Sequence, residues 1–269
     1  MTSKIRAVVL DWAGTVIDYG CFAPMEAFMN SFESAGVPIR VEEARAPMGL
    51  KKRDHIQAIL SMERVKQAWI RQYGGEATLS DVERLYESFE SLLMKSLENY
   101  TDPIPGVVET IARLRSSGIQ IGSSTGYTKT MMQVVAPQAK SKGYEPDFRI
   151  ASDEVKAARP YPYMIYRNME ELGVMSVRTV VKVGDTVTDV LEGKHAGVWT
   201  VAVVKGSSEL GLTQEEVRTM EPSELAIRME EVRGRFEQTG ADAVIDSIAE
   251  LPDIVEELNL RLKEEGLQA

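Results

Sequence analysis

The chain has 269 residues, a formal net charge of -10 at pH 7 and a hydrophobic content of 43%. This composition supports a sizeable core and excludes an intrinsically disordered chain, while the acidic balance argues against nucleic acid or an anionic membrane as partner. Cys21 is the only cysteine, so an internal disulfide framework is excluded and a reducing cytoplasm is expected. The first residues lack the apolar segment of a signal peptide, and no apolar run reaches the ~18 residues of a membrane span.

The first predicted element is a strand over residues 5–10, where an apolar run ends at the carboxylate of Asp11. A continuous apolar run of this length is typical of a strand buried on both faces of a parallel sheet. Gly14, Gly20 and Pro24 punctuate the turn and linker that follow. Because open α/β sheets bind ligands at the carboxyl ends of their strands, Asp11 is either a functional group or a residue that only caps the turn.

Residues 21–100 carry helical periodicity and almost no strand signal. The first helix presents a stripe of large apolar side chains, expected in the core or at an interface: Met25, Phe28, Met29 and Phe32. A second helix starts near Val41, and a third runs from about Lys51 to Arg71. The fourth is expected to have Ser80 as its N-cap, with Glu83 completing a capping box.

The sequence changes character at a Pro- and Gly-containing boundary over residues 102–106, and beyond it helices and strands alternate. The predicted strands lie at 119–122, 148–151, 179–183 and 200–204. This alternation predicts βαβ units, and hence a parallel sheet with helices on both faces. The strand at 5–10 belongs to this sheet, so the expected domains are an α/β core of residues 1–20 and 101–269 and an inserted helical domain of residues 21–100. The cleft between the two is the expected active site.

Two carboxylates follow the strand at 179–183, Asp185 directly after a glycine and Asp189 four residues later. Strand ends of one parallel sheet meet at the same edge, so Asp11, Asp185 and Asp189 are expected to form a cluster there. Such a cluster repels itself unless a cation neutralises it, and oxygen-only ligation favours Mg²⁺. The alternative is that Asp189 only stabilises the N-terminus of the helix that follows the strand.

Residues 122–126, Gly-Ser-Ser-Thr-Gly, also end a strand, and their hydroxyl and N–H groups at the start of a helix make an anion site. The same letters fit the Gly-x-Ser-x-Gly elbow of serine hydrolases, with Ser124 as nucleophile and His195 downstream. Residues 193–197, however, read as a helix end and not as an active-site loop. Arg159, in a loop before a helix, is suited to hold phosphate oxygens or is an ordinary surface arginine.

Together these stretches resemble the haloacid dehalogenase superfamily, whose largest branch transfers phosphoryl groups. The resemblance implies a Rossmann-like α/β core with a parallel sheet and an inserted helical cap domain. It also implies that Asp11 is the nucleophile, Thr125 the phosphate-binding hydroxyl, Arg159 the basic residue, and Asp185 with Asp189 the metal-binding acids.

Ala13 departs from the pattern of most phosphatases in this superfamily, which carry a second aspartate there as general acid on the leaving alkoxide. Without that acid an alkoxide goes unprotonated, which costs about 10²–10⁴ in rate. Lys52 and His55 lie at i, i+3 near a basic helix start. A desolvated lysine among cations loses its proton more readily and can form an imine with a carbonyl, the alternative being a solvated helix start. Because an imine is an electron sink, a carbon could then leave phosphorus as an enamine.

The chain resembles the phosphonatase family in particular, through stretches that span nearly its whole length: residues 11–15, 18–24, 47–50, 54–55, 126–128, 184–186 and 206–211. The resemblance implies hydrolysis of the carbon–phosphorus bond of phosphonoacetaldehyde to acetaldehyde and phosphate. It implies an imine at Lys52, with His55 assisting proton transfer, and an aspartyl-phosphate at Asp11 that water hydrolyses. The resemblance also implies Lys52 and not Lys51 as the imine-forming residue, because in the family the lysine lies three residues before the histidine.

The same resemblance implies Mg²⁺ held by a carboxylate oxygen of Asp11, the backbone carbonyl of Ala13 and Asp185, with Asp189 orienting the surroundings. The residues that it places around the substrate are Met48, Thr125, Gly126, Tyr127, Arg159 and Cys21. A homodimer is expected because the family is homodimeric, with the apolar stripe at 25–32 as a candidate interface.

Three other functions are open on the sequence alone. A cap-bearing phosphatase or phosphomutase of the superfamily is disfavoured by Ala13 and Lys52. A serine hydrolase would depend on Ser124 and not on a metal. A non-catalytic protein that binds phosphorylated ligands would have no need to keep Asp11, Lys52 and Arg159 together.

Overall fold

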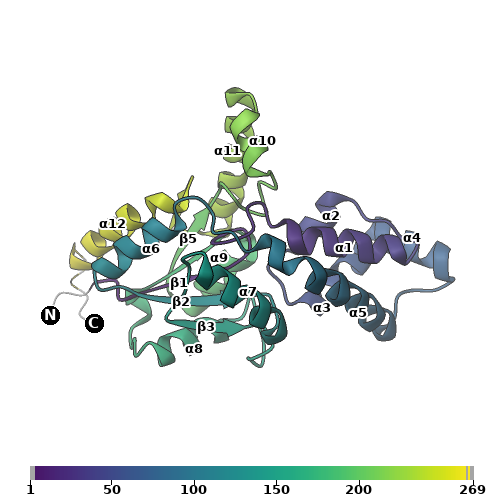
Figure 1. Ribbon diagram of the computed structural model, residues 1–269, viewed down its shortest axis with the longest axis horizontal. Coiled ribbons are helices and arrows are strands. Elements are labelled where there is room, and N and C mark those ends of the chain that lie inside the picture. Colours follow the sequence, from purple (N-terminus) through teal and green to yellow (C-terminus); the bar gives the residue numbers. More distant parts are fainter. Residues whose placement is uncertain (1–3, 265, 267–269) are drawn as a thin grey trace.

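The computed structural model describes residues 4–264 and 266. One sheet of parallel strands runs through the molecule in the order β3-β2-β1-β4-β5-β6 (Figure 1). The strands are β1 (Ala7–Leu10), β2 (Gln120–Thr125), β3 (Phe148–Ala151), β4 (Val180–Gly184), β5 (Trp199–Val203) and β6 (Ala243–Ile245). Strand β1 lies in the middle, where Leu10 is paired with Ser123 of β2 and with Val183 of β4. This parallel sheet confirms the predicted fold class.

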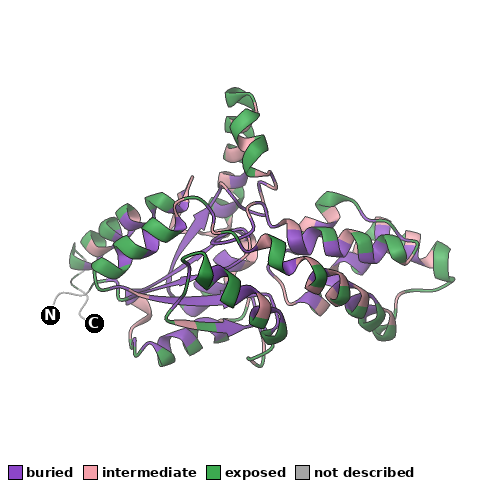
Figure 2. Ribbon diagram, viewed as in Figure 1, coloured by how far each residue is buried: buried purple, intermediate pink, exposed green. Residues whose placement is uncertain are grey.

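Helices cover both faces of the sheet, and their bounds are α6 (Val107–Ser116), α7 (Lys129–Ser141), α8 (Tyr163–Glu171), α9 (Val187–Ala196), α10 (Gln214–Thr219), α11 (Pro222–Thr239) and α12 (Leu251–Glu264). Alternate residues of β1 point to opposite faces: Val8 and Leu10 pack with α6, α7 and α12, whereas Ala7 and Val9 pack with α8. Strands β1, β4 and β5 are therefore buried on both sides, whereas Arg149 of the edge strand β3 is exposed, and the helices are exposed on their outer faces (Figure 2). Beyond residue 204 the sequence analysis assigns no element, and α10 and α11 project there from the rest of the molecule (Figure 1).

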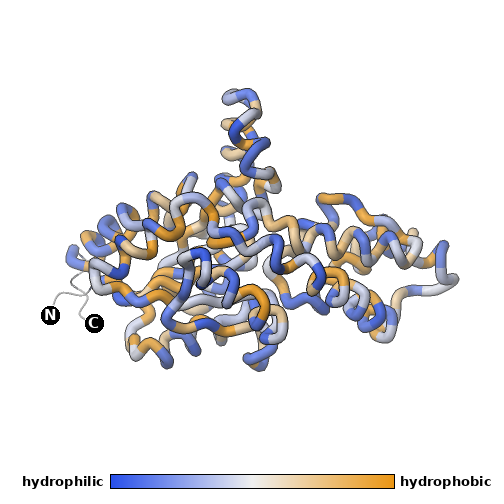
Figure 3. The backbone as a smooth tube through the Cα atoms, viewed as in Figure 1, coloured by the Kyte–Doolittle hydropathy of each residue, from blue (hydrophilic) through white to orange (hydrophobic). Residues whose placement is uncertain are grey.

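Between β1 and α6 the chain forms a bundle of helices beside the sheet, α1 (Phe22–Ser34), α2 (Val41–Arg45), α3 (Lys52–Ser61), α4 (Glu63–Tyr73) and α5 (Leu79–Ser96). We call these five helices the bundle. Polar and apolar residues alternate along them (Figure 3), and their apolar sides meet inside. Phe28 and Phe32 of α1 are fully buried, and Phe28 stacks on Phe89 of α5 with 4.2 Å between ring centroids. Met25, Phe28 and Phe32 are thus core of the bundle, whereas Met29 is half-buried, and an interface at this stripe stays a prediction. The bounds 21–100 for a separate domain stay a prediction.

Two sequence-based assignments inside the bundle are wrong. The helix expected from Lys51 to Arg71 is two helices, because Met62 adopts an extended conformation (φ -68°, ψ 130°) between α3 and α4. This break turns α4 so that Val65 and Trp69 are buried. The N-cap of α5 is Thr78 and not Ser80: the Thr78 hydroxyl accepts the N–H of Asp81, whose carboxylate accepts the N–H of Thr78.

None of the helices in the described part of the chain combines the length and the apolar character that crossing a bilayer requires.

Candidate active site

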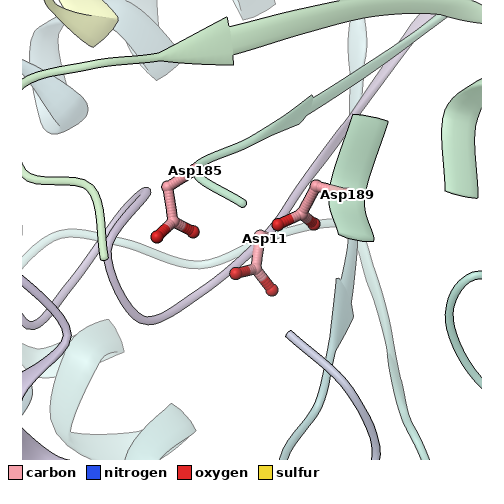
Figure 4. A group of neighbouring side chains, drawn as sticks. All are labelled: Asp11, Asp185 and Asp189. Atoms are coloured by element: carbon pink, nitrogen blue, oxygen red, sulfur yellow. The ribbon is translucent and has the colours of Figure 1, made fainter. Parts of the chain in front are cut away.

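Three aspartates meet at the carboxyl edge of the sheet, as the sequence predicts (Figure 4). Asp11 follows β1, Asp185 follows β4 and Asp189 lies in the first turn of α9. One oxygen of each lies within 4.8 Å of those of the other two, and all three residues are buried. Two glycines make room for them: a Cβ on Gly14 would lie 2.3 Å from Oδ2 of Asp185, and one on Gly184 would lie 2.2 Å from Cγ of Asp189.

Two buried cations neutralise part of this cluster. Arg159 is 3% exposed, and its Nη2 donates to Oδ1 of Asp11 at 2.7 Å while Nη1 lies 3.1 Å from Oδ1 of Asp189. Nζ of Lys182 lies 2.8 Å from the same Asp189 oxygen. Burial alone would raise the pKa of Asp189, but the charges of Arg159 and Lys182 outweigh it and lower that pKa. Arg159 is therefore no surface residue, and it connects two of the three acids.

Asp185 has no such cation among the described residues. Its carboxylate accepts hydrogen bonds from the hydroxyl of Thr15 at 3.0 Å and from the N–H of Ser208 at 2.8 Å. Burial raises the pKa of Asp185 well above its usual range, and the charges of Asp11 and Asp189 raise it further. A divalent cation bound here would offset the electrostatic cost of burying the Asp185 charge. The buried Ser208 hydroxyl also has no hydrogen-bond partner among the described residues. The oxygen-only donor set and the unneutralised carboxylate fit a hard metal ion.

The sequence analysis missed the other side of this charge network. Glu192 is fully buried in α9, and its Oε2 accepts from Nε of Arg159 at 2.9 Å and from the hydroxyl of Ser124 at 3.1 Å, with Nζ of Lys182 at 3.3 Å. Two signals could have revealed it. Lys182 interrupts the apolar run of β4, and Glu192 lies three residues after Asp189, on the same side of α9.

The serine-hydrolase alternative is wrong. The hydroxyl of Ser124 is bound to Glu192, Arg159 and Lys182, and Ser124 is fully buried. His195 lies elsewhere, with its Nδ1 2.7 Å from the carbonyl oxygen of Pro160. A nucleophile that needs histidine as its base has none here.

The end of β2 meets the loop that follows α2 in the bundle. A Cβ on Gly126 would lie 3.2 Å and 3.3 Å from the carbonyl oxygens of Leu50 and Gly49, so the glycine lets two backbones touch. From the α9 side, the hydroxyl of Thr188 donates to the carbonyl of Met48 at 3.1 Å. The loop thereby covers the sheet edge and encloses a cavity.

This cavity has a volume of about 20 Å³, room for roughly one water molecule. Its lining brings together most of the predicted site residues: Asp11, Ala13, Cys21, Met48, Lys52, Thr125, Gly126, Tyr127 and Arg159. Pro24, Gly49 and Thr186 also line it, although the sequence did not predict them. Asp185, Asp189 and His55 do not line it. The sequence thus located the two sides of the cavity, one in the sheet and one in the bundle.

Lys52 begins α3 and is 4% exposed. Its Nζ lies 5.3 Å from the ring centroid of Tyr127 and 5.7 Å from that of Phe28, and no carboxylate of the described residues forms an ion pair with it. Burial lowers the pKa of Lys52, although the nearby charge of Asp11 opposes this shift. A lysine in these surroundings is a source of free amine. Lys51 precedes α3, is only half-buried and does not line the cavity.

His55 lies one turn after Lys52 and is fully buried. Its ring stacks on Phe28 with 3.8 Å between centroids, and Nε2 lies 2.9 Å from the carbonyl oxygen of Ala44. Burial and the charge of Lys52 lower the pKa of His55 well below its usual value, so the ring is neutral. Nδ1 has no partner among the described residues. Cys21 lines the cavity, and burial raises the pKa of its thiol, which therefore stays protonated.

Comparisons with known proteins agree with this geometry. A haloacid dehalogenase-like hydrolase model matches residues 5–197, and a second model of that type matches residues 157–251. The chain is 52% identical over 253 residues to phosphonoacetaldehyde hydrolase of Bacillus cytotoxicus, and the aligned region covers 94% of this chain and 96% of that enzyme. It is 53% identical over 252 residues to the bifunctional phosphonoacetaldehyde hydrolase/aminoethylphosphonate transaminase of Clostridioides difficile, where it spans 40% of the longer enzyme.

A solved structure extends the likeness to three dimensions. The phosphonoacetaldehyde hydrolase-like protein from Oleispira antarctica superposes with a TM-score of 0.95 at 35% identity, covering 97% of this chain and 95% of that one. A β-phosphoglucomutase-like protein from Bacteroides vulgatus, at 17% identity and a TM-score of 0.66, shares the fold. The chain belongs to the haloacid dehalogenase-like hydrolases and, within them, to the phosphonoacetaldehyde hydrolase family.

Proposed function

We propose that the protein hydrolyses the carbon–phosphorus bond of phosphonoacetaldehyde to acetaldehyde and phosphate. The observation that carries this proposal is one cavity with a buried, unpaired lysine on one side and a carboxylate at a strand end on the other. Lys52 faces the aldehyde and Asp11 faces the phosphorus. Ala13, where a phosphatase would place its acid, fits a leaving group that departs as an enamine.

The first step is formation of an imine at Lys52. The free amine attacks the aldehyde carbon, and loss of one water leaves a protonated imine. The lowered pKa of Lys52 supports this role because only the unprotonated amine is nucleophilic. His55, neutral and next to the lysine, assists the proton transfers.

The second step is transfer of the phosphoryl group to Asp11. A carboxylate oxygen attacks phosphorus, the carbon–phosphorus bond breaks, and its electron pair moves into the imine to give an enamine. Protonation at carbon and hydrolysis with one water release acetaldehyde and restore Lys52. A second water hydrolyses the aspartyl-phosphate, so the net reaction consumes one water. Arg159, Thr125 and Gly126 hold the phosphoryl oxygens, and Cys21, Met48 and Tyr127 surround the aldehyde.

Magnesium is the metal that we propose for the carboxylate cluster, held by Asp11, the carbonyl of Ala13 and Asp185, with Asp189 orienting its surroundings. When bound, Mg²⁺ neutralises charge on the phosphoryl oxygens and on the carboxylates. We expect chelation of divalent cations to abolish phosphate release and Mg²⁺, but not Ca²⁺, to restore it. A chelated enzyme that still releases phosphate at the full rate would contradict this assignment.

The cavity is too small for phosphonoacetaldehyde, so substrate entry requires the bundle to move away from the sheet. This supports treating residues 21–100 as a cap domain on a core of residues 1–20 and 101–269. A homodimer, as the resemblance implies, is part of the same proposal.

The experiment that tests the proposal traps the imine. The protein is incubated with phosphonoacetaldehyde and borohydride, and the modified peptide is located by mass spectrometry. We expect the adduct on Lys52 and none on Lys51, together with release of acetaldehyde and phosphate in equal amounts when borohydride is left out. Phosphate release without any trapped lysine would contradict the imine step. Faster hydrolysis of a phosphate monoester than of phosphonoacetaldehyde would favour a phosphatase.

A further inference from the structure

We propose that Arg45 is a positioning residue that couples closure of the bundle to the placement of Asp185. The proposal rests on the proposed function, because it assigns Asp185 to the metal site of that reaction. Arg45 is the last residue of α2, at the base of the loop that covers the cavity. It belongs to the bundle, but its hydrogen bonds leave the bundle.

The guanidinium of Arg45 binds three carbonyl groups. Nη1 donates to the carbonyl of Gly20 at 2.8 Å and to that of Ser208 at 3.0 Å, and Nη2 donates to that of Gly211 at 3.4 Å. Gly20 lies in the linker before α1, whereas Ser208 and Gly211 lie in the core loop after β5. No carboxylate of the described residues forms an ion pair with Arg45. The planar guanidinium thus donates to the backbone of two core segments, which Arg45 contacts when the bundle is closed.

The fit around the guanidinium is close. A Cβ on Gly211, which has φ +65°, would lie 2.9 Å from Nε of Arg45, so only a glycine allows this approach. The Arg45 side chain also lies over the ring of Phe22, at 5.1 Å from the centroid. The loop at 206–211 therefore has a shape that accepts this arginine.

The same loop holds the metal-site carboxylate. The carbonyl of Ser208 accepts a hydrogen bond from Arg45, and the N–H of Ser208 donates to Oδ2 of Asp185 at 2.8 Å. The loop is also joined to the linker, since the N–H of Gly20 donates to the carbonyl of Gly206 at 2.8 Å. Arg45 thus binds the peptide groups that follow the contact with Asp185, and Gly20, whose carbonyl Arg45 also binds, holds the Gly206 carbonyl that precedes it.

The position of Arg45 in the chain links this contact to the cavity. A few residues after it come Met48 and Gly49, which cover the sheet edge, and then Lys52. One short segment therefore carries the amine that holds the aldehyde and the cation that fixes the Asp185 loop. When the bundle moves away, Arg45 releases that loop, and the metal site is completed only in the closed state.

The test compares Arg45→Met and Arg45→Lys with Arg53→Met. Arg53 is the matched control, because it is paired with Glu83 inside the bundle and does not contact the core loop. Three quantities are measured: hydrogen exchange of peptides that cover residues 204–212, Mg²⁺ binding by calorimetry without substrate, and kcat with KM. We expect Arg45→Met to speed exchange in the loop, to weaken Mg²⁺ binding about tenfold and to lower kcat more than it raises KM. Arg45→Lys keeps the positive charge but loses the planar set of N–H donors. Its loop exchange, Mg²⁺ affinity and kcat should therefore lie between those of the wild type and Arg45→Met.

Equal loop exchange and equal Mg²⁺ affinity in Arg45→Met and Arg53→Met would overturn the proposal. If Arg45→Met does not fold, Arg45→Lys is read against the same control and decides the outcome. The exchange and calorimetry need no turnover. Failure of the wild-type protein to cleave phosphonoacetaldehyde would therefore count against the proposed function. Unchanged loop exchange and unchanged Mg²⁺ affinity in Arg45→Met would count against the role of Arg45.

Discussion

Replacing Lys52 by methionine is expected to lower carbon–phosphorus cleavage at least about a thousandfold, roughly 4 kcal/mol of transition-state stabilisation. Methionine has a similar length and fills the same space, but it offers no nitrogen for an imine. Without the imine the carbon would leave phosphorus as the enolate of acetaldehyde, which is a poorer leaving group than a neutral enamine. The measurement is kcat/KM for phosphonoacetaldehyde, with Lys51→Met as the matched control, because Lys51 does not line the cavity.

The same substitution is expected to stabilise the fold. Lys52 is 4% exposed and has no ion-pair partner among the described residues, so its charged form is disfavoured by burial. Removing such a group should raise the free energy of unfolding by roughly 1–2 kcal/mol, which is a few degrees in Tm. The measurement is thermal unfolding of both variants.

The pH dependence of this gain follows from the lowered pKa of Lys52. Between the lowered pKa of the folded state and the ordinary lysine pKa, the unfolded state binds a proton that the folded state has lost, so the wild-type protein becomes more stable as pH rises through this range. The gain from Lys52→Met is therefore largest below the folded-state pKa and vanishes above the ordinary lysine value. A Lys52→Met variant that is less stable than wild type at every pH, with Lys51→Met unchanged, would contradict this account.

Replacing Asp11 by alanine should abolish phosphate release, with a loss of at least about ten-thousandfold, roughly 5.5 kcal/mol. The carboxylate is the only nucleophile proposed for phosphorus, and water positioned by chance is a poor substitute. Lys52 remains in place, so the imine should still form. Asp11→Asn is measured as a second variant, because asparagine keeps the shape of the side chain next to Arg159.

The trapped adduct separates the two steps. With borohydride, wild type should give Lys52 carrying an ethyl group after cleavage, in addition to the phosphonoethyl group from the uncleaved imine. Both Asp11 variants should give the phosphonoethyl adduct alone, read from the mass of the modified peptide. An ethyl adduct in Asp11→Ala would mean that the carbon–phosphorus bond breaks without this carboxylate.

The sequence predicts the acidic cluster well, because apolar runs of similar length end at Asp11 and just before Asp185. Parallel strands bring such ends to one edge whatever their order in the sheet. The assignment of Lys52 depended on Ala13, since the missing acid raised the question of how the leaving group departs. The first inference needs only local pattern and the chemistry of the side chains, whereas the choice of Lys52 over Lys51 also needs the family resemblance.

Contacts that depend on packing could not be predicted. Glu192 and Lys182 meet Ser124 only because β2 and β4 lie on either side of β1 and α9 covers their ends. Arg45 binds carbonyl groups, which every residue offers, so no sequence pattern marks its partners. At the start of α5, Thr78 and Ser80 each precede an acid by three residues, and local pattern alone does not separate the two caps.

The central position of β1 has a consequence for how the chain is made. Ala7 is paired with Gln120 and with Val180, so β1 leaves the ribosome well before the two strands that it pairs with. The bundle, whose helices are close in sequence, folds during that interval because local contacts form fastest. Until β2 and β4 arrive, the apolar residues Val8–Leu10 stay unpaired and are the part of the nascent chain most prone to aggregation. Asp11, the proposed nucleophile, is therefore synthesised long before the strands that complete its surroundings.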